Sequence, residues 1–196
     1  HLLLYLGYLN SKLGPFFLRF RSQTVNFLSG DVIRLPKLVR VASELESNVS
    51  NCLSYAKSDW DAYETSWGFT APPLLSPDYR GEKLKDSYAN LRTHWKHMTN
   101  EMQFLEEKNN RIFIDAYGLQ DELTPDVPLE EITLTCNPYY RYGNNKSEEE
   151  LEALLLADTM RELVSYAVGC MFGRYALDKP GLVLANQGET IEDYLK

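Results

Sequence analysis

The sequence predicts a mainly α-helical protein with minor β structure. Apolar residues recur at alternating steps of four and three in two stretches, 37–56 and 80–117, which places them on one face of a helix. A third stretch begins with a helix-capping pattern at Ser147. The period-two alternation typical of half-buried strands occurs only in short segments. Long helices joined by loops, with little β structure, are therefore expected.

The N-terminal residues 1–36 alternate short apolar runs with turn residues. Residues 2–9 are apolar enough for a buried helix, which we expect Gly14 and Pro15 to end. Residues 29–31 are predicted to form a turn, and residues 32–36 a short strand stopped by its proline.

A helix with a narrow apolar seam is expected over residues 37–56. The seam consists of Leu38, Ala42, Leu45, Val49, Cys52 and Ala56. We expect the aromatic side chains that follow to form a cluster, ahead of a proline-rich loop at residues 71–77. These aromatic residues are Trp60, Tyr63, Trp67 and Phe69.

The longest predicted element is a helix over residues 80–117, roughly 55 Å long at 1.5 Å per residue. Its seam is of the coiled-coil type, and Gly118 is a natural C-cap. Asn109 is the polar member of the seam, where a buried amide can fix helix register. We expect antiparallel packing against residues 37–56. The seam comprises Leu84, Tyr88, Leu91, Trp95, Met98, Met102, Leu105, Asn109, Ile112 and Ala116.

The C-terminal part is predicted to contain a strand at residues 130–135, a loop at 137–145 and a helix from Ser147 to about Tyr175. Ser147 with Glu150 forms a capping box. The helix is apolar on a broad face near its end, so we expect that end to be buried.

Charge is distributed unevenly along the chain of 196 residues, whose net charge is −8. Residues 1–57 carry seven basic and three acidic side chains, a net +4, and the remainder carries a net −12. A basic N-terminal segment in an otherwise acidic protein would suit a surface that contacts phosphates. A chance fluctuation among solvated charges fits this distribution equally well.

The cysteines and the apolar runs indicate the compartment. Cys52, Cys136 and Cys170 are widely spaced and form no metal-binding pair, which predicts buried reduced thiols in a cytoplasmic protein. No apolar run is long enough to span a bilayer, so no membrane partner is expected. Because the chain has no initiator Met and stops on a charged stretch, we interpret it as a piece of a longer protein.

The sequence offers little evidence of catalytic or metal-binding motifs. The tetrapeptide 137–140 (NPYY) is similar to the N-P-P-Y that holds a flipped adenine, but it lacks the second proline, and we favour a turn with nearby tyrosines packing on it. His94 and His97 share a helix face without a third ligand, so exposed or seam-edge histidines are expected there. The sequence contains no P-loop, nucleophile elbow, HExxH or nuclease motif, and we predict no catalytic and no metal-binding residue.

Two segments carry a family resemblance. Residues 105–123 read LEEKNNRIFIDAYGLQDEL and run into ELTPDVPLEEITLT, and residues 157–181 form a second block. Together they resemble the C-terminal half of large bacterial adenine-specific DNA methyltransferases. Among these enzymes, the chain most resembles the methyltransferases of phage-exclusion (BREX-type) systems. Fused type II restriction–methylation enzymes are close relatives of that type.

The N-terminal region resembles the end of a DNA target-recognition domain, because Leu9-Asn10-Ser11 is followed by the GDVIRLP of residues 30–36. By this resemblance, residues 1–36 are the tail of such a domain, 37–117 a helical spacer hairpin, and 118–196 a strand and loop with a C-terminal helical segment. An ordinary two-helix hairpin remains the alternative to a spacer.

DNA contacts are expected in the basic front end. Phosphates are predicted to be bound by Lys12, Arg19, Arg21, Arg34, Lys37 and Arg40. Amide side chains pair with adenine edges, which makes Gln23 and Asn26 candidates for base contacts. The alternatives are a turn role for Asn26 and a solubilising role for Arg19 and Arg21.

The resemblance implies a parent enzyme that transfers a methyl group from S-adenosylmethionine to adenine N6 in double-stranded DNA, within a restriction–modification or phage-defence system. This chain lacks a glycine-rich cofactor turn, so we expect a non-catalytic recognition and spacer piece that needs no cofactor itself. Its partners would be duplex DNA and other subunits of the defence system. The rival hypothesis is a helical protein-interaction module without DNA contact.

Overall fold

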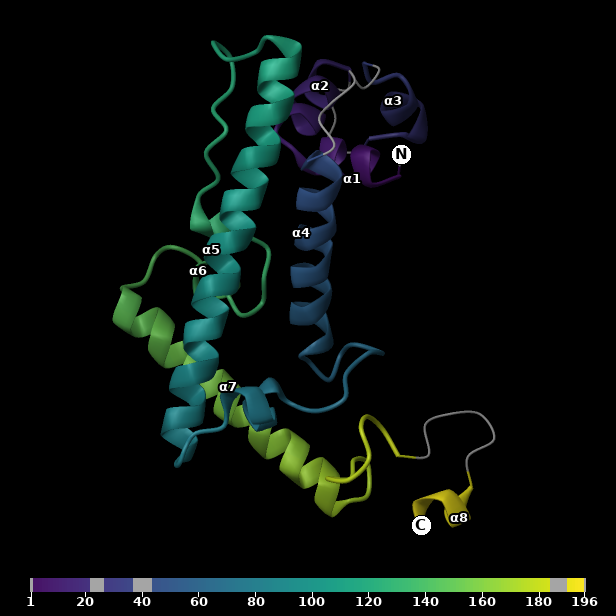
Figure 1. Ribbon diagram of the computed structural model, residues 1–196, viewed down its shortest axis with the longest axis vertical. Coiled ribbons are helices and arrows are strands. Elements are labelled where there is room, and N and C mark those ends of the chain that lie inside the picture. Colours follow the sequence, from purple (N-terminus) through teal and green to yellow (C-terminus); the bar gives the residue numbers. More distant parts are fainter. Residues whose placement is uncertain (1, 22–26, 37–43, 184–189, 196) are drawn as a thin grey trace. The chain divides into compact units, whose positions relative to one another are not determined.

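The computed structural model describes residues 2–21, 27–36, 44–183 and 190–195 (Figure 1). These residues are mainly α-helical, as predicted. Within the described ranges there is no β-strand, and one isolated antiparallel bridge joins Tyr175 to Leu182. The minor β structure expected from the sequence is thus reduced to that bridge.

The chain divides into two compact units. The first comprises His1–Tyr55 and Asn100–Ile132, and the second Ala56–Thr99 and Thr133–Lys196. The two long helices contribute residues to both units. The predicted functional division into 1–36, 37–117 and 118–196 is a separate matter and stays a prediction.

The first unit begins with three helices, α1 (Leu2–Asn10), α2 (Leu13–Arg21) and α3 (Ser29–Ile33). The predicted first helix is confirmed, but it is only partly buried, since Leu2 and Tyr5 are exposed. Gly14 and Pro15, expected to be breakers, instead lie in the first turn of α2. Proline is tolerated there because amides of the first turn have no intrahelical acceptor.

The turn predicted at residues 29–31 and the strand predicted at 32–36 are both wrong, since α3 covers most of this segment. The Asp31 carboxylate accepts a hydrogen bond from the Leu28 amide at 3.0 Å. This local side-chain bond satisfies a backbone donor at the start of the helix. It outweighs the strand preference of Val32 and Ile33.

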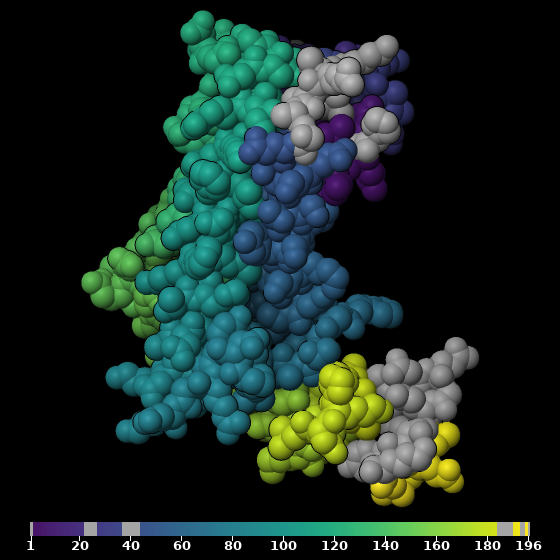
Figure 2. All heavy atoms as spheres, in the orientation of Figure 1, coloured from purple at the N-terminus to yellow at the C-terminus, as the bar shows by residue number. Residues whose placement is uncertain are grey.

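Helix α4 (Glu44–Asp61) packs antiparallel to the second half of α5 (Leu84–Tyr117) in this unit. Asn48 of α4 bonds to Asn109, and one turn further along α4 Cys52 lies near Glu106, so the residue numbers of α5 fall as those of α4 rise. Figure 2 shows side chains filling the space between the two ribbons. The predicted antiparallel pairing is therefore confirmed for residues 44–56, while residues 37–43 of the predicted helix lie outside the described ranges.

The core of the first unit joins α1 and α2 to this pair of helices. Gly7 permits the approach of α1, because a Cβ atom there would lie 2.6 Å from the Val49 side chain. The buried members of the core are Tyr8, Leu13, Leu45, Val49, Phe113 and Ile114.

The α5 seam is buried from Leu91 to Asn109 at the predicted positions, while Leu84 and Ala116 at its two ends are exposed. The helix begins at Leu84 rather than near residue 80, after two short 3₁₀ turns, η1 (Pro73–Leu75) and η2 (Pro77–Tyr79). Gly118 ends it at φ +67°, as predicted for a C-cap.

The second unit contains α6 (Pro138–Tyr142), α7 (Glu148–Met171) and α8 (Ile191–Tyr194). The capping box of α7 is confirmed: the Glu150 amide donates to the Ser147 hydroxyl, and the Ser147 amide donates to the Glu150 carboxylate. The first half of α5 pairs with α7, since the Arg92 guanidinium holds both carboxylate oxygens of Glu152 at 2.7 Å. This second partner of the α5 seam was not predicted.

The strand predicted at residues 130–135 is wrong. A 3₁₀ turn, η3 (Leu129–Glu131), occupies its start. At its end, the amides of Thr135 and Cys136 donate to the buried Asp59 carboxylate at 2.6 and 2.9 Å. A side chain thus satisfies the amides that a sheet would otherwise have paired.

Two predictions about apolar side chains also fail. The end of α7 is not buried, because Val164, Met171 and Phe172 are 61%, 83% and 84% exposed. The expected aromatic cluster does not form, since Trp60 and Trp67 are exposed while Phe69 packs on other rings. Those rings are Tyr166 and Tyr175.

The Asn48–Asn109 hydrogen bond (3.1 Å, buried) yields a stability prediction. Asn109→Ala should lower the free energy of unfolding by about 1–3 kcal/mol, because it leaves the Asn48 amide buried without a partner. The double variant Asn48→Leu/Asn109→Leu should recover most of this loss. Urea unfolding measures both, and equal stability of the single variant and the unaltered protein would contradict the assignment.

The Asp59 carboxylate yields a second stability prediction. Asp59→Ala removes the charged acceptor of two backbone amides and should cost about 1.5–3 kcal/mol. Asp59→Asn keeps one carbonyl oxygen and should lose less. The ranking of the melting temperatures, unaltered above Asn above Ala, is the readout, and an Ala variant as stable as the Asn variant would speak against this role.

Candidate functional site

Three of the predicted DNA-contacting arginines lie exposed on neighbouring helices. Arg19 and Arg21 occupy the last turn of α2, and Arg34 directly follows α3, which contacts α2. Among the described residues, no carboxylate pairs with any of the three. We call this surface, Arg19, Arg21 and Arg34, the arginine face.

Lys12 differs from these arginines. Its ammonium donates to the backbone carbonyl of Asp126, and its own amide donates to the Asn110 side chain at 2.9 Å. It is half-buried and helps to hold the segment after α5 in place. Four other predicted contacts lie outside the described residues: Gln23, Asn26, Lys37 and Arg40.

The tetrapeptide 137–140 starts helix α6, so the loop predicted at 137–145 is wrong in its first half. Asn137 is fully buried, and its side-chain oxygen accepts from the Tyr139 amide at 3.2 Å. Pro138 occupies the first helical position, where a missing N–H is harmless. The motif acts here as a helix cap with a proline behind it.

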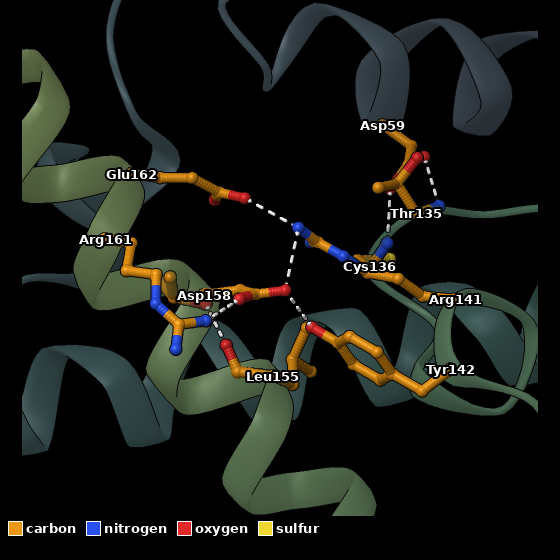
Figure 3. Close-up of polar contacts among 10 residues, drawn as sticks. Asp59, Thr135, Cys136, Arg141, Tyr142, Leu155, Asp158, Arg161 and Glu162 are labelled. Carbon is orange, nitrogen blue, oxygen red and sulfur yellow. Dashed lines mark hydrogen bonds and ion pairs between the residues drawn. The ribbon is translucent and has the colours of Figure 1, made fainter.

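A cluster of charged and aromatic side chains joins α6 to α7 (Figure 3). The Nη2 atom of Arg141 lies 3.0 Å from Glu162 and 3.2 Å from Asp158. The Tyr142 hydroxyl donates to Asp158 at 2.7 Å, and Arg161 pairs with the same carboxylate. We call these five residues the α6–α7 cluster.

Aromatic rings flank the central guanidinium of this cluster. Arg141 lies 5.5 Å from the ring centres of both Tyr63 and Tyr142, which is cation–π range. The cluster was not predicted from the sequence. Its one local signal is that Asp158 and Glu162 stand four residues apart, hence on one helix face.

The two carboxyl groups that share Arg141 titrate differently. Burial raises the pKa of Glu162, and the hydrogen bond and charge of Arg141 partly oppose that rise. The hydrogen bond from Tyr142 lowers the pKa of Asp158, with help from both neighbouring arginines. The pKa of Glu162 is thus raised and that of Asp158 lowered, although both carboxyl groups contact the same guanidinium.

A hollow of about 580 Å³ opens beside the cluster, within the second unit. Its wall comes from the end of α4, the segment after α4, α6 and α7. The residues important for its chemistry are Trp60, Tyr63, Phe69, Arg141, Glu162 and Ser165.

The described residues offer few other candidate functional sites. Across the described ranges, no group of three His, Cys, Asp or Glu side chains is placed to hold a metal ion. His94 and His97 are exposed on α5, as predicted, and the three cysteines are unpaired thiols. None of the described helices is both long and apolar enough to cross a membrane.

Comparison with known proteins identifies relatives, although no protein-family model matches the chain. It is 33% identical over 183 residues to the adenine-specific methyltransferase BrxX of Escherichia coli O9:H4 (strain HS), and 32% identical over 187 residues to the adenine-specific methyltransferase PglX of Lacticaseibacillus casei (strain Zhang). These matches cover 93% and 94% of this chain but 15% and 14% of the relatives. The chain is therefore related, over nearly its whole length, to the BREX-type adenine-specific methyltransferases.

Proposed function

We propose that this chain is a non-catalytic part of an adenine-specific DNA methyltransferase of a phage-defence system, and that it contacts duplex DNA through the arginine face. The observation that carries the proposal is the set of exposed arginines, Arg19, Arg21 and Arg34, without acidic partners among the described residues. The names of the two relatives supply the reaction and the substrate class. In this proposal α4 and α5 serve as the helical spacer.

Electrostatics supports the arginine face as a phosphate-binding surface. Residues 1–36 contain one acidic side chain, Asp31, and its carboxylate is engaged at the start of α3. Guanidinium groups bind phosphate oxygens in pairs, and each neutralised phosphate releases counterions. The amide side chains of Gln23 and Asn26 are the proposed contacts to base edges.

The chain's own residues do not fit a catalytic or cofactor role. Asn137, in the tetrapeptide most similar to a methyltransferase motif, is fully buried and caps α6. No glycine-rich cofactor turn occurs in the sequence. S-adenosylmethionine and the methyl-transfer step are therefore assigned to other parts of a longer, cytoplasmic enzyme.

A second candidate function is a protein-interaction module, and one observation favours it. The end of α7 exposes the apolar side chains of Val164, Met171 and Phe172, and exposed apolar surface can mark a protein–protein contact. Such a face suits another subunit of the defence system. The two functions do not compete for residues.

The DNA proposal predicts a change in salt dependence. The double variant Arg19→Ala/Arg21→Ala should bind duplex DNA more weakly, and its slope of log K against log salt should flatten by about 1.8, because two phosphate contacts are lost. Fluorescence anisotropy with a labelled duplex at several salt concentrations measures both.

A matched control removes the same charge elsewhere. Arg80→Ala/Arg161→Ala takes two exposed arginines from the second unit and should leave the slope unchanged. Neutralising Glu148, Glu149 and Glu150 should not weaken binding. Absence of duplex binding at low salt, or equal slopes for the two double variants, would contradict DNA contact through the arginine face. The protein-interaction module would then be the remaining hypothesis.

A further inference from the structure

The hollow beside the α6–α7 cluster has the size and lining of a small-molecule site. Its volume, about 580 Å³, lies within the range of ligand pockets in proteins. Three aromatic residues line it, Trp60, Tyr63 and Phe69. Trp60 is 58% exposed, so its ring is available to a ligand entering from solvent.

One polar group at this hollow has unused hydrogen-bonding capacity. Within the described part of the chain, the guanidinium of Arg141 forms its hydrogen bond and ion pairs through Nη2 alone, although a guanidinium carries five N–H donors. The remaining N–H donors can bind acceptor atoms of a ligand or of water.

The charges around the hollow nearly cancel. Arg141 is balanced by Glu162, and Glu64 in the wall pairs with Arg174 at 3.0 Å. An anionic ligand would meet the two carboxylates, and a cationic ligand would meet Arg141. A flat, uncharged ligand with hydrogen-bond acceptors fits these surroundings best.

We propose that this hollow binds an unstacked, uncharged nucleobase. The base would stack on Trp60, and its carbonyl or ring-nitrogen acceptors would receive N–H donors of Arg141. Flipped bases are held in this way in other proteins, by aromatic stacking and by hydrogen bonds to the base edge. The inference rests on the proposed function for the source of the base, a DNA strand, but not on the arginine face.

The test uses uncharged nucleosides as probes. Thymidine and 2′-deoxyadenosine are titrated into the ¹⁵N-labelled protein, and chemical-shift changes should centre on residues 60–72, 135–142 and 162–165. Trp60→Ala should weaken nucleoside binding about tenfold through loss of stacking. Ser165→Leu, at an exposed position in the wall, should weaken it by filling the space.

The chain provides a matched control in Trp67, which is exposed and does not line the hollow. Trp67→Ala should bind nucleosides like the unaltered protein. The three variants Trp60→Ala, Ser165→Leu and Trp67→Ala should all have the melting temperature of the unaltered protein. Arg19→Ala/Arg21→Ala should also leave nucleoside binding unchanged, so this test and the duplex test can fail separately.

Three results would overturn the proposal. One is the absence of shifts at nucleoside saturation, and another is equal affinity of Trp60→Ala and Trp67→Ala. The third is a preference for a charged probe, because stronger binding of thymidine 5′-monophosphate would mark an anion site. Stronger binding of tetramethylammonium would mark a cation site instead.

Discussion

The fold depends on one requirement, that the 34-residue helix α5 bury an apolar seam along most of its length. A helix of this composition gains most of its stability from packing rather than from propensity. Two different partners meet the requirement. In the first unit α4 supplies the buried Asn48–Asn109 hydrogen bond, and in the second unit α7 supplies the Arg92–Glu152 pair. Both contacts are polar and directional, so they also specify helix register.

Local signals explain what could be predicted from the sequence. The seam, the Asn109 position, the Gly118 cap and the Ser147 box each depend on residues a few positions apart, and each is present. The failures come from two sources. The segments at 32–36 and 130–135 have strand-like patterns, but a carboxylate accepts hydrogen bonds from nearby backbone amides instead. Asp31 accepts from Leu28 at the start of α3, and Asp59 accepts from Thr135 and Cys136. At the end of α7, periodicity identifies an apolar face without showing whether a partner covers it.

The same reasoning applies to the candidate sites. The arginine face was predictable because charge is read directly from composition, whereas its exposure had to come from the structure. Lys12 shows that composition alone does not reveal whether a basic side chain is available to DNA, since its ammonium donates to the Asp126 carbonyl. The α6–α7 cluster and its hollow combine residues near positions 60, 141 and 162, and no sequence pattern links segments that far apart.

A net charge of −8 does not argue against DNA contact. At physiological ionic strength the field of an exposed charge is screened within about 8 Å, so phosphates respond to the side chains nearest to them. Around Arg19, Arg21 and Arg34 the sequence has one acid, and that acid is engaged in the backbone. In the α6–α7 cluster the balance is different, because Arg141 is shared by Asp158 and Glu162. Among the described residues, Arg19, Arg21 and Arg34 thus have no acidic partner, whereas Arg141 is neutralised by its two carboxylates.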